Sequence, residues 1–237
     1  MRSAILGAVL LLGACTANGG EDERPRAMGQ RNFQVGAFEG VTLEGSHDVI
    51  VTVGGAPTVR AEGEVEELDR LDIRVEGGTL MIGSRRSERW FSFRRHRGVT
   101  VYVTAPALNA ASIQGSGDLR VDRVQSDAFQ AEIAGSGDLQ IGQIQAGRAS
   151  FAIAGSGDIR AAGRADSADV SVAGSGNMGL DRLQTRHASV SVAGSGNVSV
   201  NASELVDGSV MGSGNVRVVG GARCTVNKMG SGNVSCS

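Results

Sequence analysis

The residues best suited to chemistry are acidic and amide side chains that recur at nearly constant spacing. Each ends a four-residue phrase, Gly-Ser-Gly-Asp or Gly-Ser-Gly-Asn, and the seven positions are Asp118, Asp138, Asp158, Asn177, Asn197, Asn215 and Asn233. If the phrases stack about 4.8 Å apart, neighbouring aspartates repel by roughly 0.9 kcal/mol in water. A buried run of aspartates would need a cation, whereas an exposed run would not.

Asp118, Asp138 and Asp158 are therefore the candidate ligands for a cation such as Ca²⁺. The comparison is with calcium-binding β-roll repeats, but those have a period of about nine residues and a different glycine pattern. The asparagine half of the column can form a side-chain ladder without any charge. The sequence accordingly predicts no metal site and no cofactor, and keeps these three aspartates as the alternative.

A second chemical feature is the basic, aromatic segment 84–98, which is the charge-dense part of the chain. Its candidate ligand-binding residues are Arg85, Arg86, Arg89, Trp90, Arg94, Arg95 and Arg97. Arginine interleaved with aromatic residues suits phosphate, anionic lipid or an acidic polysaccharide. The alternative is a solvated hairpin whose aromatic side chains cover part of the fold. We treat the segment as an insertion that faces a partner.

Catalytic motifs are poorly represented. The three histidines, His47, His96 and His187, are scattered, and we expect each to be exposed to solvent. The stretch 174–179 fits a dinucleotide-binding pattern by accident, because no βαβ unit surrounds it. A polysaccharide-active β-helix enzyme stays open as an alternative, since the acidic column lies beside Arg120 and Arg160. The formal charge of −2 gives no argument for nucleic acid.

The phrases belong to a repeat that must position these residues. Their first glycines are Gly115, Gly135, Gly155, Gly174, Gly194, Gly212 and Gly230, with steps of 20, 20, 19, 20, 18 and 18 residues. Apolar residues alternate with polar ones on both sides of each phrase, which is strand periodicity. Glycine allows the backbone to bend at positive φ. Each repeat is therefore predicted to be strand, corner and strand.

A third apolar position about nine residues after the glycine, at Val124, Ile144 and Leu183, indicates a third short strand. A unit of this length, with three short strands, has the size of one coil of a parallel β-solenoid. We predict an all-β chain with one β-helix domain, 33–237, and regular repeats over 108–237. Gly45-Ser46-His47-Asp48 is a degenerate eighth corner, and the 70 residues between Gly45 and Gly115 are enough for three coils and an insertion. Within them, 61–73 fits a short helix or an irregular excursion.

The first residues describe an export signal. A short charged start is followed by an apolar run and by Leu12-Gly13-Ala14-Cys15, which resembles the bacterial lipobox. We predict a lipoprotein signal peptide over 1–14, lipidation of Cys15 and a flexible polar tether over 15–32. The alternative is an ordinary signal peptide with an incidental cysteine. Thr16 after the cysteine favours the outer membrane, by resemblance to the sorting rule of enteric bacteria.

The two remaining cysteines lie at the end of the array. Cys224 and Cys236 are six residues before and after Gly230, so both take the inward phase of the last coil. A disulfide there would close a loop of 13 residues and contribute on the order of 3 kcal/mol. Two buried thiols are the alternative.

Several of these features together resemble the bacterial putative auto-transporter adhesin, head GIN domain family. They are the lipobox, the stretch Glu44–Val53, the stretch Val103–Leu108 and the serial Gly-Ser-Gly-Asp/Asn corners. The likeness covers nearly all of 33–237. It implies a parallel β-helical envelope protein, often lipid-anchored, and supplies no catalytic residues.

The sequence thus favours a non-catalytic, lipid-anchored binding or adhesion module of the cell envelope. Its expected partners are the membrane, through the anchor, and an envelope polysaccharide, an anionic lipid or another envelope protein. A polysaccharide-active enzyme and a purely structural scaffold are the competing functions.

Overall fold

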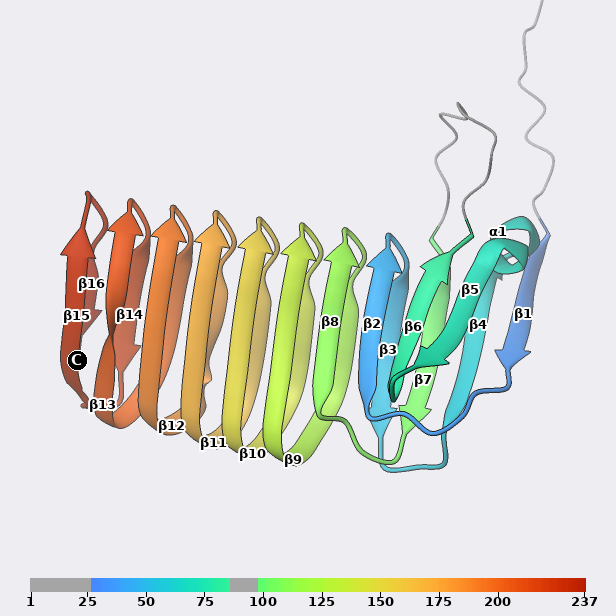
Figure 1. Ribbon diagram of the computed structural model, residues 1–237, viewed down its shortest axis with the longest axis horizontal. Helices are drawn as coiled ribbons and strands as arrows, with labels where there is room; N and C mark the ends of the chain where they lie inside the picture. Colours follow the sequence, from blue (N-terminus) through green and yellow to red (C-terminus); the bar gives the residue numbers. More distant parts are fainter. Residues whose placement is uncertain (1–26, 86–97) are drawn as a thin grey trace, which may run out of the picture.

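The computed structural model describes residues 27–85 and 98–237, which form a β-solenoid with one short helix (Figure 1). The strands are β1 (Met28–Phe33), β2 (Gly40–Gly45), β3 (Asp48–Val53), β4 (Thr58–Glu64), β5 (Leu71–Glu76), β6 (Thr79–Ser84), β7 (Thr100–Ala105), β8 (Ala110–Gly115), β9 (Leu119–Gly135), β10 (Leu139–Gly155), β11 (Ile159–Gly174), β12 (Met178–Gly194), β13 (Asn197–Gly212), β14 (Asn215–Val219), β15 (Arg223–Met229) and β16 (Val234–Cys236). The helix is α1 (Val65–Arg70). Within the described ranges, no helix is long and apolar enough to cross a membrane.

The regular array from β8 to β16 is a stack of parallel coils. Each long strand pairs in register with the next, as Ile133 with Ile153 and Val172 with Val192. These four side chains are at most 2% exposed, and their neighbours in sequence face solvent. The alternation read from the sequence therefore does form the core, and the predicted β-solenoid with 18–20 residues per coil is confirmed.

Large and small core residues compensate one another between adjacent coils. Phe129 of β9 lies in register with Ala149 of β10, whereas Phe151 of β10 lies in register with Ala131 of β9. All four side chains are buried. The two phenylalanines thus fill neighbouring columns without stacking on each other, which lets the narrow core reach a close-packed density.

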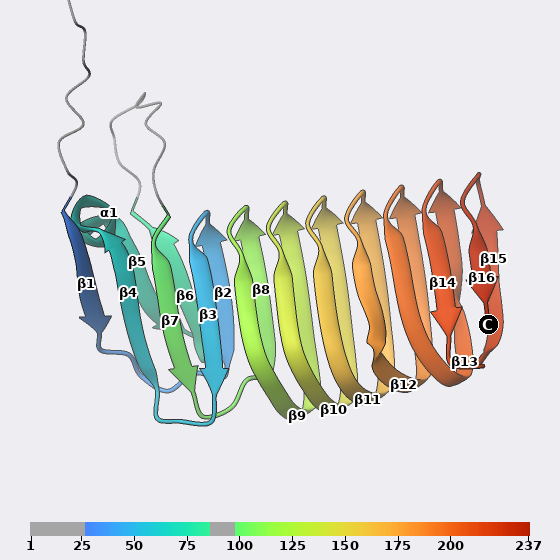
Figure 2. The same ribbon diagram turned by 180° about the vertical axis from the view of Figure 1, so that it is seen from behind.

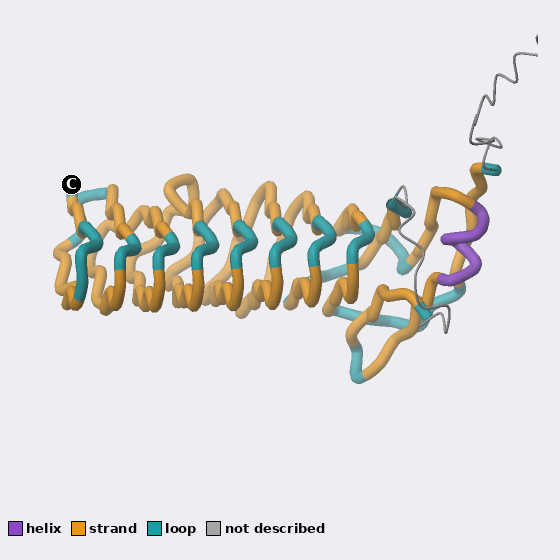
Figure 3. Tube along the Cα trace, turned by 90° about the horizontal axis from the view of Figure 1, so that it is seen from above, coloured by secondary structure: helices purple, strands orange, loops and turns teal. Residues whose placement is uncertain are grey.

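The glycine corners form one column along the solenoid (Figure 3). At a typical corner, Gly155 has φ 140°, and the N–H groups of Ser156 and Gly157 donate to the carbonyl oxygen of Gly135 at 2.9 and 3.3 Å. A Cβ at Gly155 would lie 2.1 Å from that oxygen. A Cβ at Gly157 would lie equally close to the oxygen of Gly137. The first position needs glycine because its φ is positive and because the neighbouring coil leaves no room for a Cβ. The second position needs glycine for the second reason alone.

The degenerate corner at Gly45 is the first of this column. Gly45 pairs with Gly115, β2 with β8 and β3 with β9, so this coil lies directly beside the regular array. The expectation of three coils between the two corners is therefore wrong. Of the intervening strands, β3 and β8 belong to the stack, and the others lie on the far side of β2 and β3.

That far side is an antiparallel cap. β6 and β7 continue the parallel pairing beyond β2 and β3, but β5 and β4 then pair antiparallel to β6 and β7, and β1 pairs antiparallel to β4. The helix α1 joins β4 to β5 within the predicted region 61–73 (Figure 2). Reversing the strand direction ends the solenoid repeat at this end of the molecule.

Strand β1 begins inside the segment 15–32 that the sequence assigns to the tether. Its side chains are mostly exposed, and it is held by pairing with β4 and by Arg31, which reaches Asp69 at 2.6 Å and the carbonyl oxygen of Leu68 at 3.1 Å. The folded part therefore starts at Met28, before the predicted Phe33. An edge strand that buries little apolar surface leaves no hydrophobic pattern in the sequence.

The opposite end carries the two late cysteines. Cys224 of β15 and Cys236 of β16 are joined by a disulfide, with their Cα atoms 6.6 Å apart. They lie in register with Val206 and Val218, so both occupy the inward phase. Lys228 lies in register with the buried Val210 but is itself exposed. The bridge ties together two strands that have no further coil beside them in the structure.

Candidate functional site

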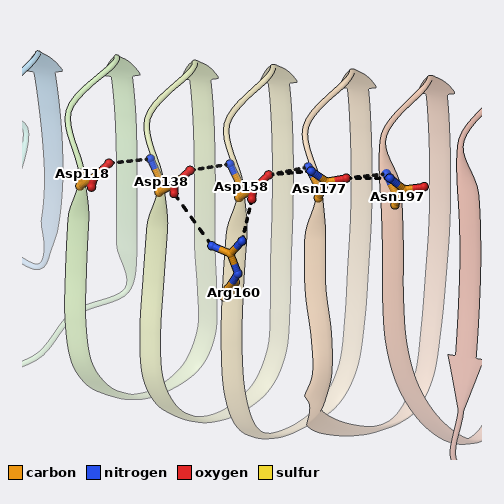
Figure 4. Close-up of polar contacts among 6 residues, drawn as sticks. All are labelled: Asp118, Asp138, Asp158, Arg160, Asn177 and Asn197. Carbon is orange, nitrogen blue, oxygen red and sulfur yellow. Dashed lines mark hydrogen bonds and ion pairs between the residues drawn. The ribbon is translucent and has the colours of Figure 1, made fainter.

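The column of acidic and amide residues forms a hydrogen-bonded ladder (Figure 4). Oδ1 of Asp118 accepts from the backbone N–H of Asp138 at 3.2 Å, and Oδ1 of Asp138 accepts from that of Asp158 at 3.1 Å. In the amide half, Nδ2 of Asn197 donates to Oδ1 of Asn177 at 2.8 Å, and Nδ2 of Asn215 to Oδ1 of Asn197 at 2.7 Å. Each side chain therefore binds the next coil.

The charge of the ladder is partly balanced by Arg160. Its guanidinium lies 2.7 Å from Oδ2 of Asp158 and 3.9 Å from Oδ2 of Asp138. These side chains are partly exposed, so solvent screens the repulsion between the aspartates. Among the described residues, no group of three or more His, Cys, Asp or Glu could hold a metal ion. We assign the ladder a structural role in keeping the coils in register.

This role predicts different effects for two substitutions at Asp158. Asp158→Ala removes the acceptor for the N–H and Nδ2 of Asn177, so we expect the free energy of unfolding to fall by about 1–2 kcal/mol. Asp158→Asn retains Oδ1 and should stay within about 0.5 kcal/mol of the parent. Urea unfolding measures both values, and Ca²⁺ should not raise the Tm of the parent. A rise with Ca²⁺ that Asp158→Asn abolishes would restore the metal hypothesis.

The predicted basic site lies largely outside the described residues, and so does Cys15. Arg86, Arg89, Trp90, Arg94, Arg95 and Arg97 fall in the gap, and only Arg85 is described. Arg85 is exposed, and its backbone N–H donates to the carbonyl oxygen of Arg70 at 2.9 Å. The strands that flank the gap, β6 and β7, are in register with β2 and β3.

His47 differs from the expectation that all three histidines are exposed. It is 7% exposed, and its Nε2 lies 2.6 Å from Oγ of Ser84. A serine next to a histidine is the start of a nucleophilic site, but such a site needs a third group to orient the ring. The buried Nδ1 of His47 has no hydrogen-bond partner among the described residues. His187 is half-exposed, as expected, and lies 3.3 Å from Glu204, whereas His96 falls in the gap.

The burial of His47 predicts a pH dependence of stability. Burial lowers the pKa of His47 below 6.5, against the opposing effect of the charges on Glu67 and Asp48. The unfolded chain then takes up this proton at higher pH than the folded chain. We therefore expect the free energy of unfolding to fall as the pH drops below about 6.5. Urea unfolding between pH 8 and 5 should show this loss, and His47→Gln should reduce it. An identical slope in the variant would contradict the assignment.

The described surface also carries a recess, midway along β10, β11 and β12. It lies where β11 is one residue shorter than the two strands beside it. Between the paired positions Ile141/Ala161 and Ile144/Gly163, β10 has two residues and β11 has one. On the other side, β12 again has one residue more than β11. Gly163 lies at this shorter segment of β11 and has a φ of 122°. A Cβ there would lie 2.1 Å from the carbonyl oxygen of Ile144. The shorter coil leaves a gap between two longer ones.

The recess has a volume of about 430 Å³, and most of the residues that line it have a polar group at the end of the side chain. The residues around it are Gln143, Ile144, Gln145, Gly163, Arg164, Arg182 and Gln184. All but Ile144 and Gly163 are exposed side chains, and Arg164 donates to Oε1 of Gln184 at 3.3 Å. Two arginines and three glutamines thus line the recess. This set can bind an anion and hydroxyl groups, and it contains no carboxylate, histidine or hydroxyl for acid–base or nucleophilic chemistry.

Sequence reasoning did not find this recess. The usable signal was the single step of 19 residues between Gly155 and Gly174, next to steps of 20 on either side. Which side of the coil lost the residue could not be read from the spacing, because any of three strands could have been shortened.

Comparison with known proteins gives one family and a consistent set of folds. The family model described as putative auto-transporter adhesin, head GIN domain, matches residues 37–222. No curated protein matches the chain.

Solved structures of three bacterial proteins share the fold. A putative adhesin from Bacteroides fragilis is 22% identical, with a TM-score of 0.81 over 89% of this chain and 97% of that one. A putative lipid binding protein from Parabacteroides distasonis is 26% identical, with a TM-score of 0.70 over 89% and 96%. A putative adhesin from Parabacteroides merdae is 15% identical, with a TM-score of 0.69 over 89% and 96%.

Proposed function

Because the chain belongs to the putative auto-transporter adhesin, head GIN domain family, we propose that it is a non-catalytic binding module of the cell envelope. The observation that carries the proposal is the polar recess, whose lining offers hydrogen-bond donors and charge but no acid, base or nucleophile. The lining lies on β10, β11 and β12, which pair in parallel on both sides of the one-residue register shift. A site on regular strands keeps its geometry better than a site on loops.

The attachment to the envelope belongs to the same proposal. Lipidation of Cys15 would anchor the chain to a membrane, and the polar residues before β1 would separate the solenoid from the lipid surface. The segment 84–98, with its arginines and aromatic residues, would add a second contact to an envelope partner. The outer membrane is the expected location.

A binding experiment tests the proposal. The full chain with Cys15→Ser, which removes the acyl acceptor, is mixed with isolated bacterial envelope material and sedimented. We expect saturable binding that unlabelled protein displaces, and no release of new reducing ends from envelope polysaccharides. Absence of displaceable binding would contradict a binding function. Release of reducing ends would favour the polysaccharide-active enzyme instead.

A further inference from the structure

We propose that the recess binds an acidic saccharide, with its carboxylate at Arg164 and Arg182 and its hydroxyl groups at the glutamines. This inference rests on the proposed binding function and assigns it a place and a ligand class. The volume of about 430 Å³ falls within the range of small-molecule sites.

The first argument concerns the charge of the two arginines. Other arginines near the recess have carboxylate partners: Arg123 with Asp122 at 3.3 Å, Arg148 with Asp169 at 3.8 Å and Arg186 with Asp166 at 3.8 Å. Arg164 and Arg182 have no ion pair within the described part of the chain. Two guanidinium groups that share one recess without a counter-charge favour an anionic group, and a planar carboxylate matches their geometry.

The second argument concerns the glutamines, which favour a ligand with hydroxyl groups over a simple anion. Each carboxamide offers both donors and an acceptor. The Oε1 of Gln184 already accepts from Arg164 and helps to orient it. Gln143 and Gln145 keep their oxygens for the ligand, and a phosphate or carboxylate ion has few or no hydrogens to give them. A ligand with hydroxyl groups beside its charge satisfies both kinds of lining residue.

The third argument concerns the surroundings of the recess. One row of side chains crosses it in register along the solenoid: Gln125, Gln145, Arg164, Gln184 and Asn201. Consecutive members are separated by one strand spacing, about 4.8 Å. An amide row that extends on both sides of Arg164 suits an extended chain rather than an isolated sugar. We infer that one charged unit enters the recess while its neighbours lie along the row.

A lipid ligand fits this site less well. The large hydrophobic side chains that are exposed in the described residues are Met28, Val65, Met211 and Met229, and none of them lines the recess. Its one apolar lining residue, Ile144, is 1% exposed. Among the described residues, therefore, no exposed large hydrophobic side chain lies in the recess to hold an acyl chain.

The test uses the full chain with Cys15→Ser and titration calorimetry. Tetragalacturonate is the probe, and cellotetraose, inorganic phosphate and phosphatidylglycerol vesicles are the comparisons. We expect tetragalacturonate to bind, and cellotetraose and phosphate to bind at least tenfold more weakly. Preferential binding of the vesicles, or equal binding of the neutral tetrasaccharide, would overturn the assignment.

Two double variants identify the site. Arg164→Gln with Arg182→Gln keeps hydrogen-bonding capacity but removes both charges, and it should weaken tetragalacturonate binding at least tenfold. Arg123→Gln with Arg148→Gln removes the same charge from arginines that have partners, and it should change binding less than twofold. Equal losses in the two would show general attraction by positive charge and would overturn the inference. So would unchanged binding in the first.

A third variant tests the shape of the recess without removing charge. An alanine inserted between Ala162 and Gly163 gives β11 the length of its neighbours, and circular dichroism reports whether the solenoid forms. The folded variant should lose binding. If the parent binds envelope material but Arg164→Gln with Arg182→Gln binds it equally well, the inference fails and the binding function stands. If the parent binds no envelope material, the proposed function fails as well.

Discussion

Replacing Gly155 with valine is expected to destabilise the whole solenoid, by about 4 kcal/mol. A residue with a Cβ at φ 140° costs roughly 1–2 kcal/mol. The new Cβ would also approach the carbonyl oxygen of Gly135 to 2.1 Å, which forces the coils apart and weakens the two hydrogen bonds from Ser156 and Gly157. Each lost bond costs about 1 kcal/mol. The sum is a large share of the 5–15 kcal/mol that typically stabilises a domain.

Gly179→Ala is the matched control for this prediction. Gly179 lies in β12, its φ is not in the left-handed region, and an added Cβ would meet nothing closer than 3.6 Å. We expect its free energy of unfolding to stay within about 0.5 kcal/mol of the parent. Urea unfolding followed by circular dichroism measures both variants. Similar values for Gly155→Val and Gly179→Ala would show that the corners tolerate side chains and that the stack is looser than described.

Phe151→Ala is expected to cost about 3–5 kcal/mol. Phe151 is 2% exposed and lies in register with Ala131 on one side and Val170 on the other. Because the core of each coil is narrow and its neighbours are fixed by strand pairing, the cavity cannot collapse by moving one element. Urea unfolding with an unchanged m-value would attribute the loss to the folded state.

Restoring the volume in the adjacent coil tests the packing between Phe151 and Ala131. Ala131→Phe alone should overpack the column and cost about 1–3 kcal/mol. Combined with Phe151→Ala, it moves the ring by one coil, so the double variant should be more stable than the sum of the two single effects by at least about 1 kcal/mol. Strict additivity would show that the two positions do not share one column.

Much of the fold could be predicted because its signals are local. The alternation around the glycines and the weak corner at Gly45 involve residues a few positions apart, and the steps of 18–20 residues between the glycines repeat along the chain. The same is true of the inward phase of Cys224 and Cys236, which follows from their distance to Gly230. Period, strand direction within the array and core columns all follow from such patterns.

The cap and the candidate site could not be predicted in the same way. β4 and β5 alternate apolar and polar residues as the strands of the array do. This alternation does not indicate that they pair antiparallel with β7 and β6. His47 occupies the corner position that is glycine in the seven regular phrases, and the serine that its Nε2 contacts, Ser84, lies 37 residues away. The basic segment was the expected site, yet the recess lies elsewhere, at Arg164 and Arg182.

The sequence by itself determined that this chain coils, with what period, and which residues face inward, because repetition and alternation are properties of neighbouring residues. Only the tertiary structure decided how adjacent coils contact one another. The second glycine of each corner is needed because the backbone of the previous coil occupies the space of its Cβ. The recess exists because a short coil lies between two longer ones. Both depend on contacts across about 20 residues of chain, which stacking creates and sequence spacing alone does not show.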